Sequence, residues 1–243
     1  MPEPTTTAVV TGAGRGFGRA IAAALVTAGY TVVGIARSER DLEAVRDELG
    51  ARFLPVAADV TEDALAEDVL REHRPGLLVL NAGAVPHMAP VHEQTWETFS
   101  RNWHVDTRHV FGWTRAALRQ PLEKGGVVVS MSSGAAIGGS PLSGGYASAK
   151  AAIRYLRAYA ADESERAGLG LRFATLLPQL TPATRLGTTG VDGYAARNGV
   201  DHNTFVQNME SVLTPEQVAK AVLEVAGGSA AEYQVSGTGL RTL

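Results

Sequence analysis

The stretch that decides the fold of this chain is Thr11-Gly12-Ala13-Gly14-Arg15-Gly16-Phe17-Gly18. It follows a short apolar, β-branched run over residues 7–11 and opens into a segment of helical period over residues 17–28. Glycines in such a strand-to-helix turn let backbone amides approach a pyrophosphate, and the helix N-terminus adds partial positive charge. Glycines also mark ordinary turns, but the position directly after the first strand favours nucleotide binding.

Short buried strands alternate with helices along the whole chain. The expected strands cover residues 7–11, 30–35, 53–56, 77–80, 127–131, 171–177 and 232–235. The expected helices cover residues 17–28, 39–49, 62–72, 96–119, 148–165 and 215–225, with Ser38 and Thr61 as N-caps of two of them. Strict alternation predicts an α/β fold, a doubly wound Rossmann domain whose parallel sheet of about seven strands is covered by helices on both faces.

The composition predicts one domain over residues 1–243. Hydrophobic residues make up 45% and charged residues 19%, as in ordinary globular proteins, and no linker interrupts the chain. We expect a cofactor-binding half over about residues 1–130 and a catalytic half over about 131–243. The long connection over residues 179–210 breaks the strand–helix rhythm, and connections of this length are usually functional or mobile, so it is the expected substrate loop.

Charge and residue usage exclude several classes of function. The net charge is −3 with scattered cations, which argues against a nucleic-acid partner. The chain has no Cys, no apolar run long enough to span a bilayer and no basic-then-apolar signal pattern, so we expect a cytoplasmic protein without a membrane partner. No metal site is expected, because no recognisable ligand spacing joins His87, His92, His104 and His109.

Several motifs follow the glycine stretch in a specific order. They are Asp59-Val60, Asn81-Ala82-Gly83, and Ser133 ahead of Tyr146-Ala147-Ser148-Ala149-Lys150. With Thr11-Gly12, Gly16 and Gly18, this order resembles the short-chain dehydrogenase/reductase family, with its TGxxxGxG, NAG and YxxxK patterns, from residue 7 to about residue 177. The resemblance implies a Rossmann-fold oxidoreductase that acts on CH–OH or C=O groups.

The resemblance also implies a set of cofactor-binding residues. They are Gly12, Arg15, Gly16, Phe17, Gly18, Arg37, Asp59, Val60, Asn81, Ala82, Gly83, Tyr146, Lys150, Pro178 and Thr181. Asp59 matches the acidic position that meets the adenine. The family places a Thr after Pro-Gly to meet the nicotinamide carboxamide, and Thr181 and Thr184 are both candidates for that contact.

Two arginines indicate NADP(H) rather than NAD(H). Ala36 stands at the end of the second strand, where relatives that prefer NAD usually carry Asp, and Arg37 follows it. A guanidinium can hold the 2′-phosphate of the adenosine by two hydrogen bonds. Arg15 resembles the second basic residue of relatives that prefer NADP.

Tyr146 is the candidate proton-transfer residue. Reduction of a carbonyl leaves an alkoxide that needs an acid nearby. Lys150 lies one helical turn away, and its charge favours the phenolate. Ser133 would hold the substrate oxygen; Ser132 is its neighbour, and the spacing to Tyr146 in the family pattern selects Ser133.

Two positions depart from the family pattern. Asp106 stands where the family has an Asn that shapes a proton relay behind Lys150, and an ionised Asp cannot donate a hydrogen bond. Three alternatives follow for Asp106: the relay works through a helix carbonyl and water, the Asp is protonated, or the position marks altered chemistry. Our hypothesis is retained reductase activity with a shifted pH optimum. The second departure is Gln179, which follows Pro178 at the position where the family has a Gly after its Pro. A positive φ is less accessible to Gln than to Gly.

The expected reaction is hydride transfer between NADP(H) and a small ketone or secondary alcohol, with Tyr146 as general acid and base. Ser133, Gln179, Leu180 and Tyr194 are the candidate substrate contacts. Alternatives are imine reduction, epimerisation or dehydration at the same site, or a non-catalytic NADP sensor. A homo-oligomer, tetramer or dimer, is implied by the resemblance alone.

Overall fold

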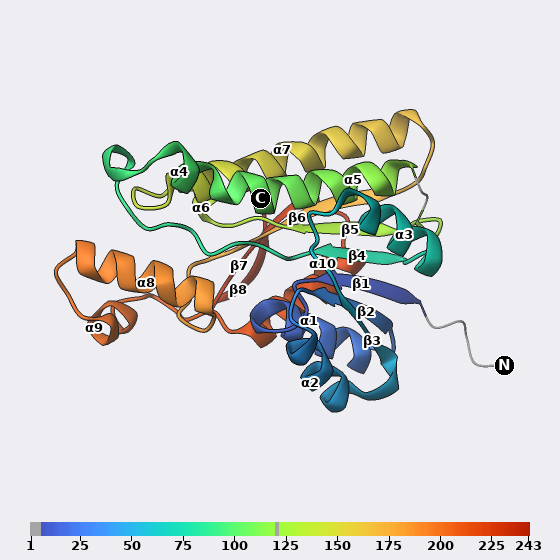
Figure 1. The fold of residues 1–243 in the computed structure, drawn as a ribbon, viewed down its shortest axis with the longest axis horizontal. Coiled ribbons are helices and arrows are strands. Elements are labelled where there is room, and N and C mark those ends of the chain that lie inside the picture. Colours follow the sequence, from blue (N-terminus) through green and yellow to red (C-terminus); the bar gives the residue numbers. More distant parts are fainter. Residues whose placement is uncertain (1–5, 120–121) are drawn as a thin grey trace.

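An eight-stranded sheet forms the middle layer of the molecule (Figure 1). The computed structural model describes residues 6–119 and 122–243. The strand order is β3-β2-β1-β4-β5-β6-β7-β8; neighbours from β3 to β7 pair in parallel, and β8 pairs with β7 antiparallel. The strands are β1 (Thr7–Thr11), β2 (Thr31–Ala36), β3 (Phe53–Ala57), β4 (Leu77–Leu80), β5 (Val127–Met131), β6 (Arg172–Pro178), β7 (Glu232–Ser236) and β8 (Gly239–Thr242).

Helices cover both faces of the sheet (Figure 1). One layer contains α1 (Gly16–Thr27), α2 (Glu39–Leu49) and α10 (Pro215–Gly227), and the other contains α3 (Asp63–His73), α5 (Arg108–Arg119) and α7 (Gly144–Arg166). Alternate residues of β1 separate the two cores: Val10 packs with the first layer, and Val9 packs with the second. The predicted doubly wound α/β fold is confirmed.

Two local expectations are corrected by the structure. Ser38 does cap α2, accepting from the Asp41 amide, but Thr61 does not cap α3. The N-cap of α3 is Glu62, because the Thr61 hydroxyl and amide both donate to Asp59. The helix expected from residue 148 begins at Gly144, where two glycines hide its start from a propensity argument.

The segment expected as one regular helix over residues 96–119 has three parts. They are α4 (Trp96–Asn102), a π-helical turn η3 (Trp103–Thr107) and α5. A π-turn inserts an extra residue into the helix and changes the direction of the side chains within it. Asp106 lies in this turn and is completely buried.

The region expected as a long loop over residues 179–210 is largely helical. It contains α8 (Arg185–Arg197) and α9 (His202–Gln207), capped by the side chains of Thr184 and Asp201. Glycines and threonines give α8 low helix propensity. The helix therefore depends on its Thr184 cap and on the packing of its buried face, which contains Gly187, Gly190, Val191 and Ala195. The expected strict alternation of about seven strands is also wrong at the end, since β8 folds back on β7 without a helix between them.

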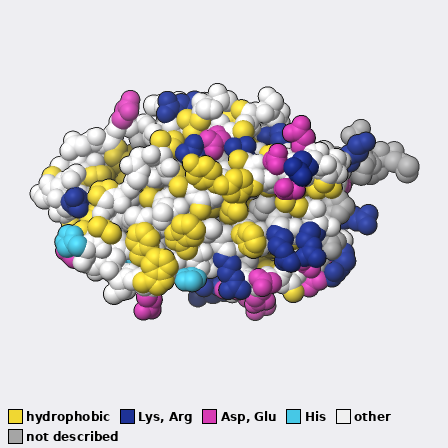
Figure 2. Space-filling model, turned by 90° about the horizontal axis from the view of Figure 1, so that it is seen from above, with side chains coloured by type: hydrophobic (Ala, Val, Ile, Leu, Met, Phe, Trp, Pro, Cys, Tyr) yellow, Lys and Arg dark blue, Asp and Glu magenta, His cyan; other side chains and the backbone are white. Residues whose placement is uncertain are grey.

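Hydrophobic side chains gather on the face seen from above (Figure 2). This outer face of α5 and α7 exposes Phe111 by 53%, Tyr155 by 65% and Tyr159 by 62%, and the two tyrosine rings stack on each other. Of the three tryptophans, Trp113 is buried, whereas Trp96 and Trp103 are exposed.

Candidate active site

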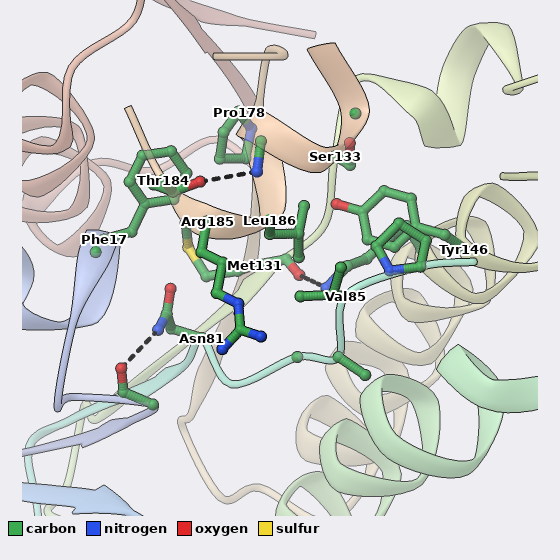
Figure 3. A pocket seen from close by; sticks show the side chains of 18 of the residues that line it. Phe17, Asn81, Val85, Met131, Ser133, Tyr146, Pro178, Thr184, Arg185 and Leu186 are labelled. Atoms are coloured by element: carbon green, nitrogen blue, oxygen red, sulfur yellow. Dashed lines mark hydrogen bonds between the residues drawn. The ribbon is translucent and has the colours of Figure 1, made fainter. Parts of the chain in front are cut away.

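A cavity of about 1100 Å³ opens at the carboxyl ends of the parallel strands. The glycine turn, the ends of β2, β4, β5 and β6, the start of α7 and one side of α8 line it (Figure 3). Ligands of open α/β sheets bind at this edge, where the strand order reverses on either side of β1. The cavity is large enough for a dinucleotide with a small second ligand.

The glycine turn has no room for a side chain at Gly12 or Gly18. A Cβ on Gly18 would lie 2.1 Å from the Gly12 carbonyl oxygen. A Cβ on Gly12 would lie 2.9 Å from the side-chain nitrogen Nδ2 of Asn81. Gly12 and Gly16 also have positive φ, at 70° and 55°. The turn therefore needs glycine both for its backbone and for the close approach of α1 to β1.

Thr11 and Asn81 join the glycine turn to the end of β4. The Thr11 hydroxyl accepts from the backbone amide of Asn81 at 2.9 Å and from the backbone amide of Ala82 at 3.1 Å. The Asn81 side chain donates to the Thr11 carbonyl at 3.0 Å. The sequence places Thr11 in the motif without a role; in the structure its hydrogen bonds fix the glycine turn to the end of β4.

The far end of the cavity is basic. Arg15 and Arg37 both line it, are exposed, and form no ion pair within the described part of the chain. Asp41 lines the same end, so the two cations are partly balanced there. Two free guanidiniums suit a phosphate dianion better than a ribose hydroxyl.

Asp59 lies in the cavity wall beside the basic end. Its Oδ1 accepts from the Thr61 amide at 2.9 Å and from the Thr61 hydroxyl at 2.7 Å, and these bonds hold the pKa of the carboxyl below its usual value. Asp59 therefore remains ionised with its other oxygen able to accept from a ligand.

Ser133 and Tyr146 meet at the other end of the cavity (Figure 3). Burial raises the pKa of the phenol; the Lys150 ammonium and then a hydrogen bond with Ser133 oppose that effect. Ser132 is excluded as the partner, because its buried hydroxyl donates to the Lys150 carbonyl at 2.8 Å. A phenol that stays protonated at neutral pH can serve as an acid.

Lys150 lies beneath Tyr146, with its ammonium 5.6 Å from the centre of the ring. The ammonium donates to the Met131 carbonyl at 3.1 Å and lies 3.2 Å from Oδ2 of Asp106. Burial alone would lower the pKa of Lys150, but Asp106 and then Tyr146 outweigh burial and raise it. The lysine therefore keeps its charge.

Asp106 itself does not line the cavity. Its Oδ1 accepts from the Ala84 amide at 2.8 Å. Asn102, one turn earlier, donates to the Ala84 carbonyl at 2.8 Å and approaches both carboxylate oxygens at 3.5 Å. Asn102 thus supplies the amide donor that Asp106 lacks, a compensation that the sequence analysis missed although both residues stand on one helix face.

The two candidate threonines differ in how their hydroxyls are used. Thr181 is buried and its hydroxyl donates to the Leu213 carbonyl. Thr184 accepts from the Gly187 amide at 3.1 Å, and its methyl group faces Gly16 across the cavity. Because the Thr184 hydroxyl donates to no described residue, Thr184 is the better candidate for a cofactor contact.

The substrate candidates line the cavity near Ser133. Leu180 and Gln179 follow β6, and Gln179 does not take positive φ, so the chain accommodates the missing glycine without strain. Tyr194 reaches across from α8 and hydrogen-bonds to Ser140, which in turn bonds to Ser143 at 2.6 Å. This chain of hydroxyls connects α8 to the start of α7 and closes that end of the cavity.

Arg185 is a cavity residue that the sequence analysis did not single out. It is the first residue of α8, and its side chain extends into the cavity between Asn81 and Val85 (Figure 3). The sequence predicts a loop here, and a loop does not fix the direction of this side chain. The helix that Thr184 caps directs Arg185 into the cavity.

His109 is buried outside the cavity lining, and burial lowers its pKa to about 3, so it is neutral. In residues 6–119 and 122–243, no group of three or more His, Asp or Glu side chains could hold a metal ion. None of the helices described there is long and apolar enough to cross a bilayer.

Comparison with known proteins gives consistent similarities. Residues 6–190 match the family model described as short chain dehydrogenase. A short chain dehydrogenase of Pseudocercospora fijiensis is 30% identical over 89% of this chain and 72% of its own length. A probable NADP-dependent dehydrogenase of Haemophilus influenzae is 30% identical over 90% of this chain and 86% of its own length. The crystal structure of 3-ketoacyl-(acyl-carrier-protein) reductase from Brucella melitensis complexed with NADH superposes with a TM-score of 0.80 at 26% identity, over 96% of this chain and 97% of that one.

Proposed function

This chain belongs to the short-chain dehydrogenase family, and we propose that it transfers a hydride between NADP(H) and a small ketone or secondary alcohol. It is an oxidoreductase acting on CH–OH or C=O groups. The observation that carries the proposal is the arrangement of Ser133, Tyr146 and Lys150 at one end of a cavity whose other end holds Arg15 and Arg37.

The residues of the cavity fit a phosphorylated dinucleotide. Gly12 and Gly18 leave no room for a Cβ, Gly12 and Gly16 have positive φ, and the turn that they form would hold the pyrophosphate at the N-terminus of α1. Arg15 and Arg37 would hold the adenosine 2′-phosphate, and Asp59 would accept from the adenine. Asn81, Pro178 and Thr184 would flank the nicotinamide end.

In reduction, bound NADPH would supply the hydride and the protein would supply the proton; in oxidation, NADP would accept the hydride and the protein would accept the proton. Ser133 would donate to the substrate oxygen and orient it beside Tyr146. The phenol proton then passes to the alkoxide oxygen in reduction, and the phenolate takes it back in oxidation. The Lys150 ammonium stabilises the phenolate that forms.

Asp106 supports this chemistry from behind. Its carboxylate keeps Lys150 charged and fixes the side chain that must reach the cofactor ribose. Because Asp106 does not reach the cavity, it cannot act on the substrate. This placement favours carbonyl reduction over the altered chemistries that its unusual identity suggests.

We also propose that the outer face of α5 and α7 pairs with a second copy of the chain. The exposed side chains of Phe111, Tyr155 and Tyr159 support this assignment (Figure 2). Solitary exposed aromatics are common on soluble surfaces, but three gathered on neighbouring helices mark a contact site. Sedimentation of the native chain and of a Tyr155→Glu, Tyr159→Glu variant tests it, and equal sedimentation would contradict it.

The decisive experiment follows NADPH absorbance over a panel of small ketones and aldehydes, with Tyr146→Phe alongside. We expect turnover by the native chain and its loss in the variant. Binding of NADPH without turnover of any carbonyl would instead support a sensor, and failure to bind NADPH would contradict the proposal altogether.

A further inference from the structure

A polar extension of about 450 Å³ leads away from the main cavity under the β7–β8 hairpin. Gln179, Glu210, Ser211 and Gln234 line both spaces, so the two are continuous. None of the four belongs to the machinery of hydride or proton transfer.

Gln234 is the central side chain of this extension. It lies on β7 and is buried, with 8% of its surface exposed. Arg241, its register partner on β8, donates to its Oε1 through Nε at 3.0 Å and through Nη2 at 2.5 Å. Arginine has no acceptor, so the amide can be oriented in one way only: Oε1 faces Arg241 and the NH2 group faces the opposite direction.

The opposite direction is the catalytic end of the cavity. The Nε2 atom of Gln234 lies 3.7 Å from the point that a Cβ on Gly134 would occupy, and Gly134 directly follows Ser133. This Nε2 forms no hydrogen bond with the described part of the protein. This atom is not among the completely buried side-chain atoms that lack a partner, so it is open to the cavity, where a ligand oxygen can accept from it in place of water.

We propose that the NH2 group of Gln234, oriented by Arg241, binds a second oxygen of the substrate, so that the preferred substrates are small ketones bearing a neutral carbonyl or ester oxygen a few atoms away. This assignment rests on the proposed function, because it concerns the same cavity. Two charges decide between a neutral oxygen and a carboxylate: Arg241 favours an acceptor, whereas Glu210, which lines both spaces without a described ion-pair partner, opposes a full negative charge.

The test compares matched substrates rather than one substrate. Methyl acetoacetate carries ester oxygens that 2-hexanone lacks on a chain of similar length, and acetoacetate carries a carboxylate instead. In Gln234→Met, which keeps the side-chain length but has no donor, we expect the kcat/KM ratio of methyl acetoacetate to 2-hexanone to fall about tenfold. Because the ratio is compared between proteins, the intrinsic reactivity of each ketone cancels.

Two further variants separate positioning from direct contact. Arg241→Met leaves the side-chain amide of Gln234 in place but free to rotate, so that its oxygen can face the cavity. We therefore expect a fall of about threefold in the same kcat/KM ratio. Gln207→Met, at an exposed glutamine of α9 outside the cavity, should leave it unchanged. Activity of every variant on 2-hexanone near the native value shows that the site is folded.

An unchanged ratio in Gln234→Met, an equal loss on both ketones, or a native preference for acetoacetate would overturn the inference. Binding of 2,4-pentanedione and of 2-pentanone to the NADPH complex, followed by NADPH fluorescence, gives a readout that needs no turnover. Discrimination in binding without any reduction would uphold the inference while the proposed function fails, and equal binding of the two would overturn it.

Discussion

The Oδ2 atom of Asp106 lies 3.2 Å from the ammonium nitrogen of Lys150, and both side chains are buried. An ion pair of this kind stabilises little by itself, because the desolvation of two charges offsets most of their attraction. Its effect here is on the proton chemistry: Lys150 lowers the pKa of Tyr146, and Asp106 raises it. In the proposed mechanism, the pH dependence of the reaction therefore depends on Asp106, a residue that does not line the cavity.

Replacing Asp106 by Asn should shift the pH–rate profile to lower pH. The change removes a negative charge that raises the pKa of Tyr146, so that pKa falls. In reduction, which needs the phenol protonated, the decline of activity at high pH should begin at lower pH. In oxidation, which needs the phenolate, activity should appear at lower pH. Profiles of kcat/KM in both directions measure the shift, and Asp162→Asn at an exposed position of α7 is the control; profiles that coincide with the native ones would rule out this role.

Replacing Arg37 by Asp should reverse the cofactor preference. The guanidinium that would hold the 2′-phosphate is lost, and the new carboxylate can accept from the ribose hydroxyl of NADH. We expect the ratio of kcat/KM for NADPH to that for NADH to fall by about 10-fold to 100-fold, the effect of a charged hydrogen bond. Arg40→Asp, an exposed position in the first turn of α2 outside the cavity, is the matched control. An equal ratio in the Arg37 variant would disprove the assignment.

Replacing Tyr146 by Phe should abolish turnover while cofactor still binds. Removal of the general acid typically costs about 100-fold to 10,000-fold in rate. Stopped-flow reduction with saturating NADPH measures the chemical step, and NADPH fluorescence measures binding. A loss of binding as large as the loss of rate would show that the phenol is needed for the site itself and not for proton transfer.

Replacing Tyr194 by Phe should loosen the substrate end of the cavity. The change removes the hydrogen bond to Ser140 but keeps the ring that stacks on Phe205 at 6.5 Å. We expect KM for a small ketone to rise about threefold to tenfold, with a smaller change in kcat. Ser140→Ala removes the same bond and also the bonds of Ser140 with Ser143, so its effect should be at least as large. Adding Tyr194→Phe to Ser140→Ala should then change little more, because the bond that the two residues share is already lost. Additive effects would contradict the connection between α8 and α7.

Replacing Gly145 by Ala should destabilise the fold by about 1–3 kcal/mol through overpacking. The new Cβ would lie 1.9 Å from the Phe99 carbonyl oxygen, where α7 crosses α4. Gly144→Ala is the matched control, since its Cβ would meet the Phe99 ring at an ordinary 3.5 Å and the loss of a helical glycine favours the fold. Urea unfolding of the two variants should therefore change in opposite directions, and a tolerated Gly145 variant would mean that α4 can move.

The sequence predicts best what local pattern determines. Buried β-branched runs located β1, β4 and β5 to the residue, and the glycine turn after β1 predicted the cofactor cradle. The pattern failed where tertiary packing overrides propensity. The glycines and threonines of α8 are typical of a loop, yet the Thr184 cap and the packing of its buried face stabilise a helix. Arg185 and the Tyr194–Ser140 bond were out of reach for that reason.

The π-turn at residues 103–107 and the strand β8 failed for a different reason. A π-turn has no signature of its own in residue spacing, so the burial of Asp106 could not be read from helical periodicity. The strand β8 is short and largely exposed and lacks an apolar alternation, so its partnership with β7 shows only in the paired backbones. The order of the motifs predicted which residues meet at the cavity, but not the contacts between the substrate wall and the hairpin.

The hairpin of β7 and β8 would separate substrate preference from the rate of the chemical step, two properties that often change together in enzymes. The side chain that orients Gln234 comes from Arg241, which has no contact with Ser133, Tyr146 or Lys150 in the described structure. On the proposed role of Gln234, mutations along residues 239–242 should change which ketone is favoured while the rate of the chemical step is preserved. A directed-evolution library confined to these four positions should therefore explore new substrates with most of its members still active.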